Sequence, residues 1–247
     1  MENKVQPAVA TRVLSLLSNQ KFKAVVALAF GTFLFILPTP RSAVAPIDTA
    51  LHAIGLLSAS ASNFERFFAA ALVVRWLQAV LLLLFVLVVL REPLSFLGIR
   101  SLRWRDVALA VGLGVLGLAL NTGLNLLLTA FGVPADTSSI TGQIITSLSL
   151  AGHLHLIANA AIYEELFFRG LLMECLIRIF NRPWLAAIVS YALFVGGHYL
   201  SGSASLARTL TVVGVGTLVL VGLYVLRRNV TLCMITHAIM DSIVVSP

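Results

Sequence analysis

The sequence predicts an all-α, polytopic membrane protein, for reasons of composition and of how its apolar residues are arranged. Of the 247 residues, 59% are hydrophobic and 11% are charged, whereas soluble domains are about 45–50% apolar and about 25% charged. The apolar residues form long runs that are nearly free of charge, which is typical of membrane-crossing helices rather than of a large soluble core. The same composition excludes a disordered chain, a disulfide-rich scaffold and a collagen-like fibre.

We expect about seven transmembrane helices. Five are predicted from apolar runs at residues 24–37, 67–90, 107–131, 184–200 and 206–226. The fourth helix in chain order, at about 152–180, and the seventh, which includes residues 237–241, are apolar but carry ionisable side chains. We expect an interfacial segment at 47–66, and a loop with Pro134 and Asp136 followed by a short surface helix within 132–150. We divide the chain into N-terminal helices at 1–106 and a core at 107–247.

The first apolar run combines features of a retained helix with features of a signal peptide. It follows basic residues and precedes Ala43, Val44 and Ala45, which resemble a small-residue cleavage site. Arg41 and Pro46 disfavour cleavage at that site, so we expect residues 24–45 to be retained as an uncleaved helix.

The basic residues predict how the chain is oriented. The net charge is +7, but the lysines and arginines are scattered between apolar segments and form no basic face for nucleic acid. Most of them fall in alternate loops, namely Lys4, Arg12, Lys21, Lys23, Arg91, Arg100, Arg103, Arg105, Arg178, Arg182, Arg227 and Arg228. By the positive-inside rule these loops and the N-terminus are cytoplasmic. We attribute the basic excess to topology and not to ligand binding.

Small and polar residues predict how the helices pack. The helix at 107–131 contains residues that let another helix approach closely, namely Gly112, Gly114, Gly117 and Gly123. Asn121 and Asn125 on the same helix predict interhelical hydrogen bonds. Two cysteines, Cys175 and Cys233, are expected to be free thiols, because they lie in no metal-binding spacing.

Ionisable side chains inside a membrane helix are costly, so each one is a candidate functional residue. At about 100° per residue, Glu165 and Arg169 are neighbours on one face of the helix at 152–180 and can form an ion pair. Glu164 points away from that pair. An ion pair that only holds helices together explains Glu165 and Arg169, but it does not explain Glu164.

Two later helices carry histidines at a helical spacing. Phe194 and His198 share one face of the fifth helix, and His237 and Asp241 share one face of the seventh. Their distances from the basic helix ends predict that Glu164, His198, His237 and Asp241 converge in a cavity between helices 4, 5 and 7. Weaker candidates are His153 and His155, on opposed helix faces, and Glu174, which is expected to pair with Arg178.

Three motifs in this order resemble those of one protein family. They are Glu-Glu-x-x-x-Arg at 164–169, Phe-x-x-x-His at 194–198 and His-x-x-x-Asp at 237–241. Their order on successive hydrophobic helices resembles that of the CPBP family, also called Abi. This family comprises CAAX prenyl proteases and bacteriocin-processing enzymes, and it contains glutamate-type intramembrane endopeptidases. The resemblance covers residues 107–247 and includes the Leu-Gly-Ile-Arg stretch at 97–100.

The resemblance implies catalytic roles for Glu164, Glu165, Arg169, His198, His237 and Asp241. Glu164 would act with His198 to activate a water for attack on a peptide carbonyl, and His237 with residue 241 would stabilise the oxyanion. The prenyl-protease branch typically has Asn where this chain has Asp241. Because an ionised Asp cannot donate to an oxyanion, Asp241 is either protonated, or it orients and charges His237.

Two other classes of function stay open from the residues alone. A zinc metallopeptidase would use Glu164, His198, His237 and Asp241 as ligands, although the chain has no His-Glu-x-x-His motif. A non-catalytic scaffold or bacteriocin-immunity protein of the same family, or a proton-coupled carrier, would keep the buried carboxylates without cleaving peptides. We favour the metal-independent endopeptidase, because the set of motif residues is intact.

The expected endopeptidase has no metal or other cofactor. Its expected partners are membrane lipids and a peptide or membrane-protein substrate, and not nucleic acid. Arginines outnumber lysines by 14 to 3, which favours a prokaryotic source and the plasma membrane. Most bacteria lack prenylated proteins, so we expect cleavage of a leader peptide, a signalling peptide or a membrane protein rather than of a CAAX protein.

Overall fold

The computed structural model describes residues 19–58, 60–133, 140–202 and 204–242. These residues form helices and no strand, which confirms the all-α class. The helices are α2 (Gln20–Ile36), α3 (Arg41–Ala53), α4 (Asn63–Leu84), α5 (Trp104–Ala130), α6 (Ile140–Ser147), α7 (Leu150–Asn159), α8 (Glu174–Phe180), α9 (Pro183–Leu200), α10 (Leu206–Arg208), α11 (Gly214–Arg227) and α12 (Val230–Met240). The predicted loop residues Pro134 and Asp136 lie outside the described residues.

Short segments of other helical types connect several of these elements. The π-helical segments are η1 (Phe85–Val89), which extends α4, η3 (Ala160–Glu164) and η4 (Leu166–Met173), which join α7 to α8, and η5 (Thr209–Val213), which joins α10 to α11. A 3-10 turn, η2 (Leu94–Leu97), precedes α5. Residues 150–180 therefore form one continuous helix, as expected for the segment with the Glu-Glu motif.

The predicted helices are present, but the predicted number of membrane spans is not confirmed. Among the described residues, four helices are long and apolar enough to cross a membrane: Asn63–Val89, Trp104–Ala130, Pro183–Leu200 and Leu206–Arg227. A fifth span results if α2 and α3, which meet at 75°, are counted together. Two of the three helices with motifs account for the difference, because α12 has only 11 residues and the helix at 150–180 carries charged side chains at its centre.

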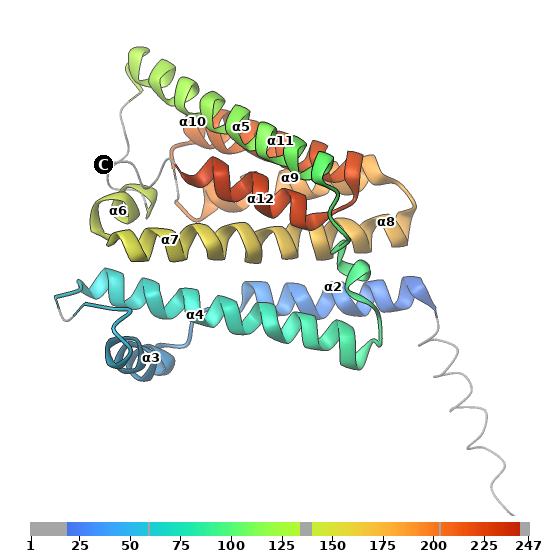
Figure 1. The fold of residues 1–247 in the computed structure, drawn as a ribbon, viewed down its shortest axis with the longest axis horizontal. Helices are drawn as coiled ribbons and strands as arrows, with labels where there is room; N and C mark the ends of the chain where they lie inside the picture. The colour runs from blue at the N-terminus through green and yellow to red at the C-terminus, as the bar shows by residue number, and fades with distance from the viewer. Residues whose placement is uncertain (1–18, 59, 134–139, 203, 243–247) are drawn as a thin grey trace, which may run out of the picture.

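The helix at 150–180 occupies the middle of the bundle (Figure 1). Helices α2 and α4 pack on one side of it, and α9 and α12 pack on the other, with α5 and α11 beyond α12. All eight residues of η4 are buried as a result. A charged side chain in this segment therefore has to find its partners inside the protein, because neither water nor lipid headgroups surround it.

Aromatic rings connect the central helix to both neighbouring layers. Phe167 stacks on Phe35 of α2 with ring centroids 4.0 Å apart, and Phe168 meets Phe194 of α9 edge to face at 4.9 Å. Phe168 also meets Phe35 edge to face at 5.3 Å, so its ring joins the two layers. Both cysteines are free, as predicted, and both are buried: Cys175 and Cys233.

Close packing of α5 against α12 confirms part of the glycine prediction. A Cβ atom at Gly114 would lie 2.9 Å from the side chain of Ile239, and one at Gly117 would lie 2.7 Å from that of Met240. These two glycines therefore permit the approach of α12. At Gly112 and at Gly123 no atom of the described residues lies within 4 Å of such a Cβ, so neither permits a close helix approach within the described part of the chain.

The two asparagines of α5 differ in their contacts. Asn125 Oδ1 accepts a hydrogen bond from Arg208 Nη1 at 2.5 Å, which confirms the predicted interhelical bond for this residue. The interhelical bond expected for Asn121 is not present, because its buried Oδ1 has no hydrogen-bond partner within the described part of the chain.

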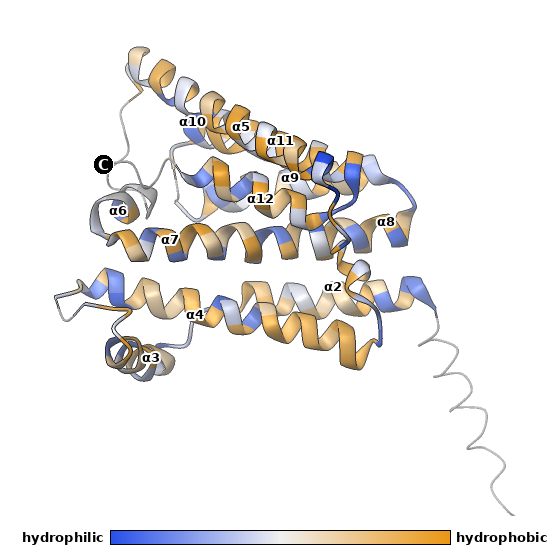
Figure 2. Cartoon of the chain, in the orientation of Figure 1, coloured by the Kyte–Doolittle hydropathy of each residue, from blue (hydrophilic) through white to orange (hydrophobic). Residues whose placement is uncertain are grey.

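The predicted cytoplasmic loops lie together at one end of the bundle, where Figure 2 shows hydrophilic residues at the ends of α2, α5 and α8. Lys23 Nζ contacts Glu92 Oε1 at 2.6 Å, and Arg178 Nη1 donates to Gln20 Oε1 at 3.2 Å. Burial raises the pKa of Glu92, but hydrogen bonds from Lys23 and Gln20 outweigh burial and hold that pKa below its usual value. These contacts join loops that are distant in the sequence.

Glu174 corrects one expectation at this end of the bundle. Instead of pairing with Arg178, its carboxylate accepts hydrogen bonds from Tyr224 Oη at 2.6 Å and from Arg228 Nη2 at 2.7 Å. Burial lowers the pKa of Arg228, but the hydrogen bonds and charge of Glu174 outweigh burial and raise that pKa. Helical spacing predicts a partner on the same helix. Arg228, in the turn between α11 and α12, instead donates to both carboxylate oxygens, and such a bidentate pair is stronger than a single hydrogen bond.

Gly170→Ala tests the packing of the central helix. A Cβ at Gly170 would lie 2.8 Å from the backbone oxygen of Leu97, and a backbone atom cannot move aside as a side chain can. We expect the free energy of unfolding in detergent to fall by about 1–3 kcal/mol. Gly222→Ala is the control, because no atom lies within 4 Å of its Cβ; it should leave stability unchanged or raise it by up to about 1 kcal/mol. Equal stability of the two variants would contradict this packing.

Candidate active site

A fully buried carboxylate, Glu165, connects two of the three motifs. Its Oε1 accepts a hydrogen bond from Arg169 Nη1 at 2.8 Å, and neither side chain is exposed. The predicted ion pair is therefore confirmed. His237 Nδ1 lies 2.8 Å from the same oxygen. This second contact was not predicted, because helical spacing reveals partners on the same helix and not those on another one.

The local backbone around Glu165 is unusual. Glu164 is the last residue of η3, and Leu166 is the first residue of η4. The Glu-Glu motif therefore lies at the junction of two π-helical segments. π-helical turns, with their i→i+5 hydrogen bonds, are rare and occur frequently at functional sites. The expected rotation of about 100° per residue does not hold through this stretch. The contact between Glu165 and Arg169, four residues apart, forms nonetheless.

His237 lies between two carboxylates. Its Nδ1 faces Glu165, and its Nε2 lies 3.3 Å from Asp241 Oδ2. Because ionised carboxylates only accept hydrogen bonds, a ring with both nitrogens directed at them donates from both, which is the arrangement of an imidazolium. The side chain of Asp241 is 33% exposed, whereas that of His237 is 8% exposed. The site is therefore more open on the side of Asp241.

Phe194 is the common neighbour of the motif residues. The guanidinium of Arg169 lies 4.7 Å from the centre of its ring, and the rings of His198 and His237 lie 4.5 Å and 6.3 Å from it. His198 Nδ1 lies 3.0 Å from the carbonyl oxygen of Phe194. Since a carbonyl only accepts, Nδ1 is the donor of this bond, which leaves Nε2 as the nitrogen free to face a ligand.

Glu164 stands apart from this contact network. It is half-buried, and within the described part of the chain its carboxylate makes no hydrogen bond or ion pair, so no such bond joins it to His198. Because α9 runs antiparallel to α8 after a two-residue connection, His198 lies one turn beyond Phe194 in the direction of Glu164. Direct contacts thus unite Glu165, Arg169, His237 and Asp241, while Glu164 and His198 lie at the edge of that set.

Several polar atoms of the buried set have no partner. Glu165 Oε2 and Arg169 Nε and Nη2 are buried, and no hydrogen bond to them is present among the described residues. Buried polar groups of this kind are uncommon in proteins. One acceptor and two donors are therefore available beside Phe194 for a ligand or a water molecule.

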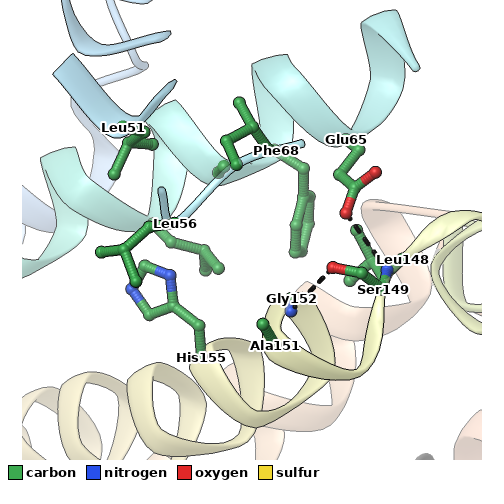
Figure 3. Close-up of a pocket in the computed structure, with 12 residues that line it drawn as sticks. Leu51, Leu56, Glu65, Phe68, Leu148, Ser149, Ala151, Gly152 and His155 are labelled. Atoms are coloured by element: carbon green, nitrogen blue, oxygen red, sulfur yellow. Dashed lines mark hydrogen bonds between the residues drawn. The ribbon is translucent and has the colours of Figure 1, made fainter. Parts of the chain in front are cut away.

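The cavity predicted between helices 4, 5 and 7 is not confirmed. A pocket of about 110 Å³ lies instead between the start of α4 and the start of α7 (Figure 3), with Phe68 and His155 in its lining. In it Glu65 Oε1 accepts a hydrogen bond from the backbone nitrogen of Ser149 at 3.1 Å. His155 accepts from Trp76 Nε1 at 2.8 Å, and the neutral imidazole is thereby part of the packing between α4 and α7.

The geometry does not favour a metal site. Among the residues that the structure describes, no group of three or more His, Cys, Asp and Glu side chains is placed so that it could hold a metal ion. The zinc hypothesis needs Glu164 and His198 together with His237 and Asp241, and the first two lie outside the contact network of the other two.

A second set of polar contacts holds the central helix against α4. Tyr163 Oη donates to Gln78 Oε1 at 2.9 Å, and Asn159 Nδ2 donates to the carbonyl of Leu72 at 3.2 Å. Arg75 lies over the ring of Tyr163 at 5.9 Å. Sequence reasoning did not single out Gln78, Asn159 or Tyr163. Their polarity inside apolar helices is the signal that could have identified them.

The comparisons with known proteins agree with the motifs. Residues 146–243 match the family described as type II CAAX prenyl endopeptidase Rce1-like. The matched segment begins in α6 and contains all the predicted site residues. No curated protein and no solved structure matches the chain. The C-terminal part of the chain, from α6 to the end of α12, thus matches the Rce1-like CAAX prenyl endopeptidases, in accordance with the CPBP resemblance of its three motifs.

Proposed function

We propose that this protein is an intramembrane, metal-independent endopeptidase that hydrolyses a peptide bond of a membrane-associated peptide or protein. The observation that carries the proposal is the contact of Glu165 with both Arg169 and His237, which brings two distant motifs together beside Phe194 of the third. The matched family is one of endopeptidases, and the apolar helices indicate an integral membrane protein.

In this proposal Glu164 and His198 activate the attacking water. Glu164 is half-buried, and its carboxylate makes no hydrogen bond within the described residues, so it can take a proton as a general base. His198 offers the lone pair on Nε2, since Nδ1 donates to its own helix. The proton removed from water would pass to the leaving amine as the C–N bond breaks. Hydroxide would remain on the carbonyl carbon, which gives the carboxyl product.

We assign stabilisation of the oxyanion to His237 and Arg169. His237 Nε2 carries a proton, and its 3.3 Å separation from Asp241 leaves room for a better acceptor to compete. The unpartnered Arg169 Nη2 is a further donor. Donors fixed by burial stabilise developing negative charge strongly, because they need no reorganisation during the reaction. Of the two roles considered for Asp241, the geometry supports orienting and charging His237.

The proposed location is a prokaryotic plasma membrane with a cytoplasmic N-terminus. The gathering of Lys23, Arg178 and Arg228 at one end of the bundle supports that orientation under the positive-inside rule. The proposed substrates are leader peptides, signalling peptides or membrane proteins. A prenylated CAAX protein is the alternative substrate class that the family description names.

Glu164→Ala, His198→Ala and His237→Ala should each abolish most peptide cleavage. Loss of a general base or of an oxyanion donor lowers kcat by about 10²–10⁴-fold. The measurement is cleavage of a leader peptide and of a lipidated peptide by purified protein reconstituted in liposomes. His52→Ala is the matched control, because His52 lies on α3 and its ring contacts Asp48 rather than a motif residue; its cleavage rate should equal that of the unmodified protein.

Two results would contradict this proposal. If the three variants fold and still cleave at the normal rate, the residues are not catalytic. If the unmodified protein cleaves neither peptide while it remains folded, a non-catalytic scaffold or immunity protein is the better description. Exhaustive chelation should leave cleavage unchanged, and its loss with restoration by zinc would favour the metallopeptidase.

Glu165→Ala and Glu164→Ala should differ in stability. Removal of Glu165 leaves Arg169 as a buried cation without its ion partner, so the free energy of unfolding should fall by about 3–5 kcal/mol. Glu164 makes no hydrogen bond or ion pair among the described residues, so its removal should cost less than about 1 kcal/mol. Thermal and denaturant unfolding in detergent measure both. A similar loss for the two variants would show that Glu164 also has a structural role.

Asp241→Asn tests whether residue 241 acts through His237. An amide keeps a hydrogen-bond acceptor for Nε2 and adds a donor, so cleavage should stay within about tenfold of normal. Asp241→Leu has a similar size and neither group, and kcat should fall further, with KM little changed. The dependence of kcat on pH should shift in Asp241→Asn, because the carboxylate that charges His237 is gone. An unaltered pH profile would contradict this role.

A further inference from the structure

A polar pocket of about 340 Å³ lies at the basic end of the bundle, away from the candidate active site. It is formed where the segment that enters α5 meets the turn between α11 and α12. Its charged lining residues are Arg100, Arg103, Asp106 and Arg227. Its volume falls in the range of about 300–1,000 Å³ that is common for ligand pockets.

The pocket carries an excess of positive charge. Three arginines face one aspartate, which gives a net charge of +2 for the lining. Arg227 Nε binds Asp106 Oδ1 at 3.1 Å. Arg100 reaches Glu174 only at 3.9 Å, and the exposed Arg103 makes no hydrogen bond or ion pair within the described residues. The guanidinium of Arg103 is therefore available for an anion, and that of Arg100 is held only by a long ion pair.

The wall of the pocket is fixed by the backbone. Asn229 Nδ2 donates to the carbonyl oxygens of Arg100 and Ser101, both at 3.3 Å, and the nitrogen of Val230 donates to the carbonyl of Gly98 at 2.9 Å. These bonds join the segment before α5 to the start of α12. The two segments that carry the arginines are thus held next to each other, so that Arg100, Arg103 and Arg227 line one pocket.

Helix α5 adds to the positive potential. It begins at Trp104, and its N-cap residue Arg103 provides no side-chain hydrogen bond to the first turn. The positive end of the dipole of this 27-residue helix therefore lies beside the guanidinium groups without a side-chain cap, and Asp106 in the first turn offsets part of its charge. The helix dipole and the guanidinium groups both favour an anion with several acceptor oxygens.

Exposed apolar side chains belong to the pocket lining or are its neighbours in the sequence: Leu226 lines the pocket, and Leu102 and Trp104 flank Arg103. Leu102 is 47% exposed, Trp104 is 76% exposed and Leu226 is 72% exposed. Exposed tryptophan is enriched where a membrane meets water. A ligand that combines an anionic head with an apolar tail would contact both the arginines and these residues, whereas a free anion would leave the apolar side chains uncovered.

We propose that the pocket lined by Arg100, Arg103 and Arg227 binds the phosphate group of an anionic phospholipid. The planar guanidinium of arginine matches phosphate oxygens in a bidentate manner, and basic pockets between membrane helices are suited to lipid headgroups. These basic residues would thus bind lipid in addition to orienting the chain in the membrane. The headgroup would hold the entry to α5 against the turn between α11 and α12, at the base of the helix that carries His237.

Lipid binding by purified full-length protein tests this proposal. Native mass spectrometry from detergent, with phosphatidylglycerol as the probe and phosphatidylcholine as the neutral lipid, should give preferential retention of phosphatidylglycerol. Arg103→Ala should weaken binding about fivefold, which corresponds to about 1 kcal/mol for one basic residue. Arg100→Ala combined with Arg103→Ala should weaken it roughly 25-fold. Arg182→Ala, which removes an exposed arginine outside the pocket, should leave affinity unchanged.

Several outcomes would overturn the proposal. Equal retention of phosphatidylcholine and phosphatidylglycerol would exclude recognition of the phosphate charge. Equal affinity of the pocket variants and Arg182→Ala would place the lipid elsewhere. Inorganic phosphate and glycerol phosphate serve as soluble probes: binding of either as tightly as the lipid, with the same loss in Arg103→Ala, would assign the pocket to a free phosphate. Unfolding without added lipid controls for folding, and Arg103→Ala should match the unmodified protein there.

Discussion

Burial of the Glu165 carboxylate is the constraint on which the arrangement of the helices depends. An isolated charge in an apolar interior costs several kcal/mol, and only partners with good geometry offset that cost. One partner, Arg169, lies on the same helix, but the second, His237, lies on α12. Helix α12 must therefore lie directly against the central helix. Because Gly114 and Gly117 lack a Cβ atom, α5 can pack closely against α12.

The same constraint separates the candidate active site into two kinds of groups. Glu165 and Arg169 are fully buried and hold each other, with Phe194 beneath the guanidinium. Glu164 and His198 are half-buried and less engaged. Groups that hold a charge in place benefit from burial, because a low dielectric strengthens their attraction. Groups that exchange protons with water and substrate need access, and the edge of the network provides it.

Much of this organisation is predictable from periodicity. The pair of Glu165 and Arg169 follows from spacing along one helix, because residues three and four apart lie on one face. The apolar runs predict the approximate helix positions, and the small residues of α5 predict the close approach at Gly117. Contacts between helices do not follow in this way. Glu174 binds Arg228 rather than Arg178, and among the described residues no helix approaches α5 closely at Gly112. The predicted cavity and seven spans were inferred from depth and hydropathy, which contain no information on which helices become neighbours.

The sequence by itself determined that this chain is a helical membrane protein, which residues are costly to bury, and which family its motifs resemble. Those properties are local, since composition, spacing and motif wording are read along the chain. Only the tertiary structure decided that His237 meets Glu165, and that arginines more than a hundred residues apart, such as Arg103 and Arg227, line one pocket. The reason is physical: packing of helix faces brings distant segments into contact. Charged residues that are scattered along the sequence therefore become concentrated where those segments meet.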